Sequence, residues 1–173
     1  HSTARFLPAY GAYEQGSGLF DVGKVWDALS TNLKTDEIVS RAPVATVLSG
    51  FLATPEFGPG IYQREGFTAG TTRTIDIVFT RTKGQAGAKN YNLSWLGNDG
   101  TFSSADSIAL PRGVGVALPV TVRPPAPGAH SAILRLQDQA TGFNHYQVLN
   151  TVVATDPFTA ENGYSVTYAG SGD

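Results

Sequence analysis

Histidine, the usual acid–base side chain near neutral pH, occurs at three positions of this sequence: His1, His130 and His145. Neither internal histidine has a second histidine or a carboxylate at a metal-ligand spacing, and the motif H-E-x-x-H does not occur. Both lie beside turn residues at the end of a predicted strand. We therefore predict hydrogen-bonded, structural roles for them and assign no catalytic or metal-binding residue.

Serine can act as a nucleophile when a sharp turn exposes it, as in the motif G-x-S-x-G, which this sequence lacks. Ser17 stands between two glycines without a strand–turn–helix context, and we interpret this stretch as a tight turn. Gly58 to Ile61 lacks the Lys-Ser/Thr of a phosphate-binding loop and reads as a turn before a strand. Because the chain contains no cysteine, thiolate catalysis, disulfides and cysteine-based metal sites are excluded. No cofactor is predicted.

Three oxygen-bearing residues, Asn98, Asp99 and Asp106, are close enough in sequence to suggest Ca²⁺, which prefers several oxygen ligands. Their spacing matches no known calcium loop, and the glycines at 97 and 100 favour a hairpin turn. We favour the turn and leave the calcium alternative open. Asn92 begins a glycosylation sequon inside a predicted strand, and no modification is predicted there.

The composition is that of a globular domain, with 41% hydrophobic and 15% charged residues among 173. The net charge is −2 and no basic block occurs, which argues against nucleic acid and anionic membrane as partners. No apolar run approaches the roughly 18 residues that a membrane span needs. Since methionine is absent, we expect the chain starting at His1 to be a processed product or a fragment.

One helix is predicted, near the start of the chain. Val22, Val25, Trp26 and Leu29 recur at i, i+3, i+4 and i+7, which places them on one helical face. Asp21 stands where a side-chain oxygen can cap the first turn. We expect this face to dock on the rest of the domain. If it faces a missing catalytic domain instead, Trp26 will be exposed in this chain.

Beyond about residue 35 the period changes to two, as in half-buried strands. Predicted strands cover Thr74–Thr80, Tyr91–Trp95 and Val114–Val122, with further candidates at Ile38–Arg41, Ala45–Ala53, Ile108–Leu110, Ser131–Gln137, Tyr146–Val153 and Tyr164–Tyr168. The apolar side chains of Phe79, Tyr91, Trp95 and the Val114–Val122 ladder are expected in the core. Pro119 cannot donate to a ladder, so its strand should lie at an edge or bulge there.

Many short strands with frequent turns predict a mainly β fold, an immunoglobulin-like or fibronectin-III-like antiparallel β-sandwich with one short N-terminal helix. The sandwich is assigned to residues 35–157. Residues 158–173 are assigned as a linker followed by a final strand or the start of a following domain.

Three segments carry a family resemblance. Gln15 to Leu29 resembles the closing segment of the catalytic domain in subtilisin-family (S8) serine peptidases, where a G-x-G-hydrophobic-x-(D/N)-V turn leads into a helix ending in Ala-Leu. Gly58 to Glu65 is similar to the G-x-G-I-Y-L-R element of tripeptidyl-peptidase II-like subtilases. Pro127 to Ala132 is similar to the P-G-x-H-x-A/G start of a strand in their immunoglobulin-like domain.

The resemblance implies that residues 1–34 are the tail of a subtilase catalytic domain. It also implies that the Asp, His and Ser triad motifs lie upstream, and none is present here, so no catalytic residue is carried over. The leading hypothesis is a non-catalytic accessory domain of a secreted or cell-surface bacterial peptidase. Its main expected partner is the catalytic domain of the same protein, and protein substrate or other subunits are the further candidates. The alternative is a module that binds protein, peptide or glycan.

Overall fold

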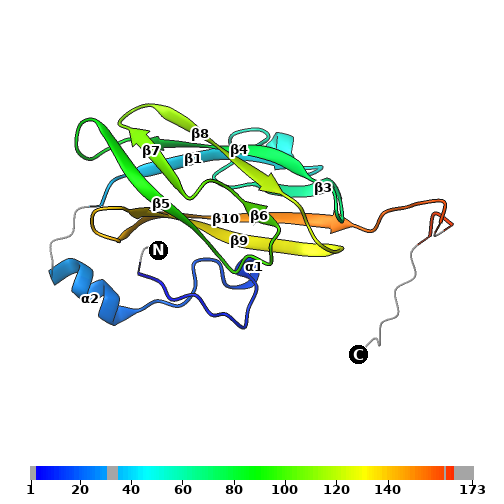
Figure 1. Ribbon diagram of the computed structural model, residues 1–173, viewed down its shortest axis with the longest axis horizontal. Helices are drawn as coiled ribbons and strands as arrows, with labels where there is room; N and C mark the ends of the chain where they lie inside the picture. Colours follow the sequence, from blue (N-terminus) through cyan, green and yellow to red (C-terminus); the bar gives the residue numbers. More distant parts are fainter. Residues whose placement is uncertain (1–2, 31–34, 162, 166–173) are drawn as a thin grey trace.

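The computed structural model describes residues 3–30, 35–161 and 163–165, and within them the fold is mainly β (Figure 1). The helical elements are short: α1 (Ala12–Gln15), α2 (Val22–Ser30) and the 3₁₀ turn η1 (Ser49–Phe51). The strands are β1 (Ile38–Ala45), β2 (Phe57–Gly58), β3 (Tyr62–Thr68), β4 (Arg73–Arg81), β5 (Ala88–Leu96), β6 (Phe102–Ser103), β7 (Ser107–Pro111), β8 (Gly115–Val122), β9 (Gly128–Asp138) and β10 (Asn144–Thr155).

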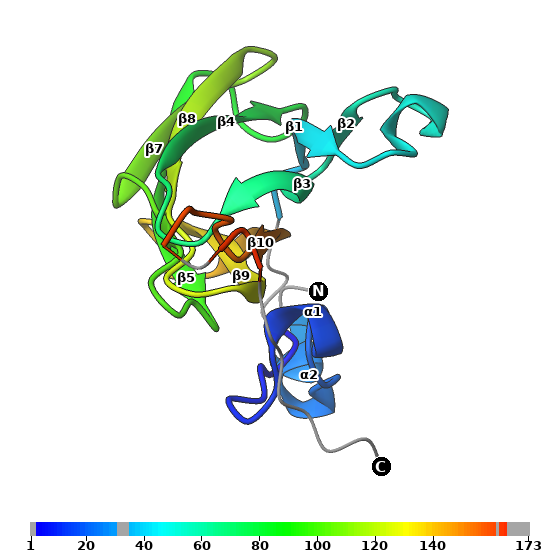
Figure 2. The same ribbon diagram turned by 90° about the vertical axis from the view of Figure 1, so that its right-hand side faces the viewer.

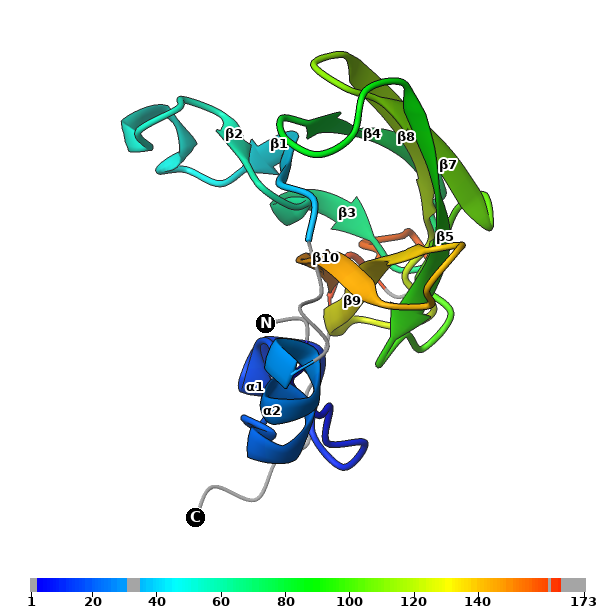
Figure 3. The same ribbon diagram turned by 90° about the vertical axis from the view of Figure 1, so that its left-hand side faces the viewer.

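The strands form one curled sheet in the order β6-β8-β4-β1-β3-β10-β9-β5-β7, with β2 paired to β1. Strand β1 makes the turn between the two halves, because Ile38–Arg41 pair with β4 and Val44–Ala45 pair with β3. The halves face each other across the core, as Figures 2 and 3 show. The predicted immunoglobulin-like fold is confirmed. It is not purely antiparallel, since β3 pairs in parallel with both β1 and β10.

The core lies between the two halves of the sheet and follows the predicted alternation. Ile77 and Phe79 of β4 and Tyr91 of β5 are fully buried. In β8, Leu118, Val120 and Val122 are buried, whereas Val114 lies before the strand and is exposed. Trp95 is half-buried and stacks on Phe102, with ring centroids 5.3 Å apart.

Pro119 lies at an open edge of the sheet, as predicted. Strand β6 covers β8 only opposite Thr121 and Val122, while Pro119 is exposed beyond that pairing. On its other side Pro119 sits opposite Asp76 of β4. Its missing N–H therefore costs no ladder hydrogen bond.

Two predicted strands are wrong or only partly described. Instead of a strand over Ala45–Ala53, β1 ends at Ala45, and the chain turns through η1, where Ser49 N donates to Thr46 O. Apolar residues in this stretch face solvent, so their pattern does not mark a sheet face. Tyr164 and Ser165 are not in a strand, and the rest of the predicted Tyr164–Tyr168 strand lies outside the described residues.

The N-terminal segment packs on the outer face of β9. Ala12 of α1 is fully buried, and Tyr13 N donates to Ser131 Oγ of β9 at 2.9 Å. Phe6 lies against Gly97, where an added Cβ would come within 2.6 Å of the phenyl ring. This segment therefore covers part of the β9 surface and leads the chain into α2.

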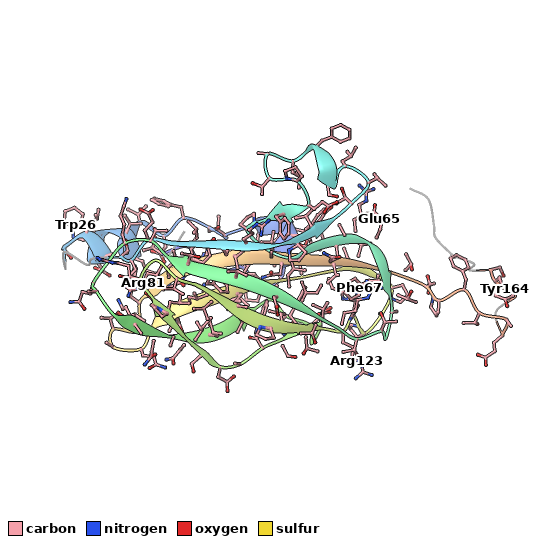
Figure 4. The ribbon with its side chains drawn as sticks, turned by 90° about the horizontal axis from the view of Figure 1, so that it is seen from above. Trp26, Glu65, Phe67, Arg81, Arg123 and Tyr164 are labelled. Atoms are coloured by element: carbon pink, nitrogen blue, oxygen red, sulfur yellow. The ribbon has the colours of Figure 1, made fainter. Side chains whose placement is uncertain are left out.

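Helix α2 begins where the sequence predicts, with Asp21 Oδ1 accepting from Lys24 N at 3.1 Å. Its predicted apolar face does not dock on the sandwich. Val22, Trp26 and Leu29 are 69%, 70% and 71% exposed, and only Val25 is half-buried. Trp26 projects at the end of the molecule in Figure 4. The docking prediction is wrong for this chain, and the alternative of an open face holds.

Candidate functional site

A cluster of ionisable side chains lies at one end of the sandwich, where β1 begins. The residues come from the segment before β1 and from β4, β5, β9 and β10: Asp36, Arg81, Lys89, Tyr91, Asp138 and His145. We call these six residues the ionic cluster. Of the histidines singled out in the sequence, it contains His145.

Asp36 is the centre of the ionic cluster. Its Oδ2 accepts from Lys89 Nζ at 2.6 Å and from Tyr91 OH at 2.7 Å, and its carboxylate is 7% exposed. The backbone N–H of Asp36 donates to Nδ1 of His145 at 2.9 Å. The segment that precedes β1 is therefore tied to β5 and to β10 through this one residue.

Arg81 is fully buried at the end of β4, and its guanidinium is satisfied mainly by backbone carbonyls. Nε donates to Leu110 O at 3.1 Å and Nη1 to Gln85 O at 2.8 Å, while Nη2 donates to Gly87 O. The carboxylate of Asp36 lies 3.8 Å from Nη1 and supplies the compensating charge. This arrangement closes the β4–β5 loop over the end of the core.

The charges of the ionic cluster shift the pKa values of its members. Burial would raise the pKa of Asp36, but hydrogen bonds from Lys89 and Tyr91 outweigh it and hold the pKa below its ordinary value. Burial likewise opposes the lowered pKa of Asp138, which accepts from the Ala140 N–H and from Lys89. Burial and the positive charge of Lys89 lower the pKa of His145, so its ring is neutral near pH 7.

The ionic cluster is built for cohesion. Both carboxylates face cations within 4 Å, and Nδ1 of His145 is occupied as an acceptor by the Asp36 N–H. A general base needs a free lone pair aimed at an incoming substrate, which this nitrogen does not offer. The cluster therefore fixes the start of β1 against β5, β9 and β10.

The other internal histidine, His130, closes the turn before β6. Its Nδ1 lies 2.5 Å from Asp99 Oδ2, and its Nε2 lies 2.7 Å from Ala126 O. Asp99 Oδ1 also accepts from Thr101 N at 3.1 Å. Burial would raise the pKa of Asp99, but its bonds to Thr101 and His130 lower it. The pair links the β5–β6 turn to the start of β9.

Other candidates from the sequence have structural partners, whereas Asp106 is exposed between β6 and β7. Asn98 bonds the N–H and C=O of Phe102, and Asn92 on the surface of β5 accepts from Gln139 at 2.9 Å. Gly60 packs so closely on β10 that a Cβ would lie 2.0 Å from the carbonyl oxygen of Leu149. In the described ranges no group of three or more His, Asp or Glu side chains is placed to hold a metal ion.

Helix α2 presents the open apolar face of Val22, Trp26 and Leu29, which we call the helix surface. A pocket of about 400 Å³ lies beside it, between α2, the N-terminal segment and the β9–β10 hairpin. Arg135 lines this pocket, and its Nε is buried without a hydrogen-bond partner in the described part of the chain. Burial lowers the pKa of Arg135. The space between α2 and the β9–β10 hairpin is therefore incompletely filled.

Comparison with known proteins places this geometry in a family. A family model of the Ig-like domain in actinomycete serine proteases matches residues 39–154. The chain belongs to this family. No curated protein sequence gives a significant match. The match starts one residue after the first residue of β1 and ends one residue before the last residue of β10.

Among solved structures, tripeptidyl peptidase 2 is similar over 88% of this chain, with a TM-score of 0.65 and 19% identity. The chain spans 13% of that protein, and at this identity the likeness shows the fold alone. A FixG-related protein from Vibrio parahaemolyticus covers 70% of the chain at 11% identity, with a TM-score of 0.43 over 98% of its own length. The expected Ig-like domain of a serine protease is confirmed by the family match, and the likeness to tripeptidyl peptidase 2 confirms its fold.

No helix among the described residues is both long enough and apolar enough to span a membrane. The family match identifies residues 39–154 as an Ig-like domain of the kind found in actinomycete serine proteases.

Proposed function

We propose that this Ig-like domain stabilises and positions the catalytic domain of a secreted bacterial subtilisin-like serine peptidase, and that the helix surface is the contact. Hydrolysis is then the work of residues outside this chain. The observation that carries the proposal is the exposed face of α2, which precedes an Ig-like domain whose family occurs in serine proteases.

The helix surface has the properties of a domain interface without its partner domain. Helix α2 is nine residues long, and an isolated helix shorter than about 12 residues is marginal in water unless packing supports it. Burying a large apolar side chain contributes about 1.5–3 kcal/mol, and Val22, Trp26 and Leu29 leave most of that unrealised here. A neighbouring domain that covers them would stabilise both partners.

Two further features support a peptidase as the neighbour. The segment from Gln15 to Leu29 resembles the end of a subtilase catalytic domain, and it contains the helix surface itself. Residues 1–34 would then belong structurally to the catalytic domain, residues 35–157 to the Ig-like domain and residues 158–173 to a linker. An extracellular location follows from the same proposal.

The proposal is tested by comparing this chain with a longer product that includes the sequence encoded upstream of His1. In the longer product we expect peptidase activity that a serine-directed inhibitor abolishes, together with a G-T-S-M-A-x-P motif before residue 1. Trp26→Ala should shorten the half-life of that activity on heating, yet leave the melting temperature of the present chain unchanged. Phe158→Ala is the matched control, because Phe158 is an aromatic residue of similar exposure at 64% outside the helix surface.

Two results would reject the proposal. One is peptidase activity in the purified 173-residue chain itself. The other is equal heat inactivation of the longer product in its wild-type and Trp26→Ala forms.

A further inference from the structure

A second apolar surface lies far from α2, on the excursion between β1 and β3. We call residues 46–57 the apolar loop. Figures 2 and 3 show that it extends away from the curled sheet on the side of β1 and β2. Four of its large apolar side chains face solvent: Val47 (81% exposed), Leu48 (65%), Phe51 (88%) and Leu52 (41%).

The apolar loop is held in a defined shape by its own backbone. Ser49 N donates to Thr46 O, Phe51 N to Leu48 O and Glu56 N to Ser49 O, all between 2.9 and 3.0 Å. Glu56 adopts a positive φ of 63°, a conformation that costs a non-glycine residue energy, and it closes the loop by accepting from Val44 N at 2.8 Å. A loop held in this way loses little conformational entropy when it binds.

A groove of about 720 Å³ lies next to the apolar loop on the same molecule. Val39 of β1, Leu52 and Ala53 of the loop, Phe57 of β2 and Tyr62 of β3 line it. A projecting phenyl ring and an apolar groove that could receive one therefore stand side by side. A surface with both features can pair with a copy of itself about a two-fold axis, each copy giving and receiving the same contact.

We propose that the apolar loop is a self-association surface, and that two copies of this chain pair with Phe51 of each seated in the groove of the other. The interface is independent of the helix surface. It adds an oligomeric state to the accessory role proposed above.

The charges beside the apolar loop suit such a pairing. Arg41, whose guanidinium lies 3.3 Å over the ring of Phe57, lines the groove on one flank. On the other flank of the apolar loop, Glu56 and Glu65 line a second hollow. Glu65 is labelled near the base of the loop in Figure 4. Because the surface carries both signs, Arg41 of one copy can meet a glutamate of the other at the rim.

The apolar area that two copies would bury determines the expected affinity of the dimer. The four exposed side chains present on the order of 400 Å² of apolar surface, a size that marks interaction sites on soluble proteins. With the groove walls, two copies would bury on the order of 1,000 Å² in total, the low end for specific association. We therefore expect a reversible dimer with a dissociation constant on the order of 10 μM.

Sedimentation equilibrium of the purified chain measures this directly. The wild-type chain should pass from monomer to dimer as its concentration rises through the micromolar range. Phe51→Asp should raise the dissociation constant at least tenfold, while Trp26→Asp, on the helix surface, should leave it unchanged. Circular dichroism melting of each variant confirms folding, which is expected because both side chains are largely exposed.

Chemical cross-linking provides a second readout, because the chain has no cysteine of its own. Leu52→Cys should give a covalent dimer with a short bis-maleimide, and Val114→Cys, exposed on the turn before β8, should not. A chain that stays monomeric at 100-fold above the expected dissociation constant overturns the proposal. A dimer lost in Trp26→Asp and kept in Phe51→Asp also overturns it and assigns the interface to the helix surface.

Discussion

Replacing Asp36 by alanine removes the anion on which the ionic cluster depends. Lys89 loses its bond of 2.6 Å but keeps Asp138 at 3.1 Å, and Tyr91 loses its acceptor at 2.7 Å. Arg81 loses the carboxylate at 3.8 Å, its one ion-pair partner in the described residues, and keeps three backbone carbonyls.

The expected loss of stability depends on the interactions that Lys89 and Arg81 keep. Breaking a buried ion pair by removing one partner costs about 3–5 kcal/mol, and the surviving bonds of Lys89 and Arg81 place this change near the lower end. We expect Asp36→Ala to lower the free energy of unfolding at pH 7 by about 3 kcal/mol. For a chain of this length that corresponds to a fall of roughly 6–12 °C in Tm.

The effect must depend on pH in a defined direction. The pKa of Asp36 lies below its unfolded value, so the folded state binds fewer protons and the carboxylate stabilises it above the unfolded pKa. That contribution is lost as the pH falls through the folded pKa. The pKa values of Asp138 and His145 are lowered as well, so the whole domain should lose stability on acidification, beginning near pH 6.5 with His145.

Urea unfolding of wild type and variant from pH 7.5 to pH 3 tests both the size and the direction. The gap between the two curves should be largest at neutral pH and narrow in acid. Glu37→Ala is the matched control, because Glu37 is the neighbouring carboxylate and pairs with Lys83 at 2.7 Å on the surface. An unchanged midpoint for Asp36→Ala at pH 7, or an equal loss for Glu37→Ala, would refute the reasoning.

Two other substitutions probe the packing. Gly60→Ala places a Cβ 2.0 Å from the carbonyl oxygen of Leu149 and should cost about 2 kcal/mol or more, whereas Gly50→Ala, with nothing within 4 Å, should be neutral in the same urea titration. Trp95→Ala removes the stack on Phe102 and should cost about 3 kcal/mol, measured as a lower Tm by calorimetry. A Tm equal to that of wild type would place Trp95 outside the cooperative core.

Much of the sheet was predictable, because most strands bury one face and expose the other. The alternation in β4 and β8 identifies Ile77, Phe79, Leu118 and Val120 as core residues, and the structure buries all four. Asp21 predicts the start of α2 because a cap depends on local sequence alone. The order of the strands and the parallel pairing of β3 were not predictable, since they depend on contacts between distant segments.

The ionic cluster shows where sequence reasoning ends. Its members lie between Asp36 and His145, and no spacing connects them. The signal that could have indicated it is weak: Lys89 and Asp138 are charged residues near the ends of strands that bury one face, where an unpaired charge would be costly. Strand pairing places β10, β9 and β5 side by side, and the curl of the sheet brings β4 to the same end.

The helix surface and the apolar loop show a second limit of prediction from sequence. The period of Val22, Trp26 and Leu29 correctly identifies one helical face, whereas the apolar run from Val47 to Leu52 predicted a strand and instead forms an exposed loop. The spacing of apolar residues indicates which side chains share one face, but it does not indicate which segment or which other molecule buries that face. A core residue and an interface residue satisfy the same pattern, and the difference appears only as exposure: 70% at Trp26 and 88% at Phe51, against complete burial at Phe79. Exposed aromatic residues at two separate places on one small domain are costly unless each is buried in a complex. Both proposals therefore assign these exposed aromatic residues to contacts, Trp26 with a catalytic domain and Phe51 with a second copy of this chain.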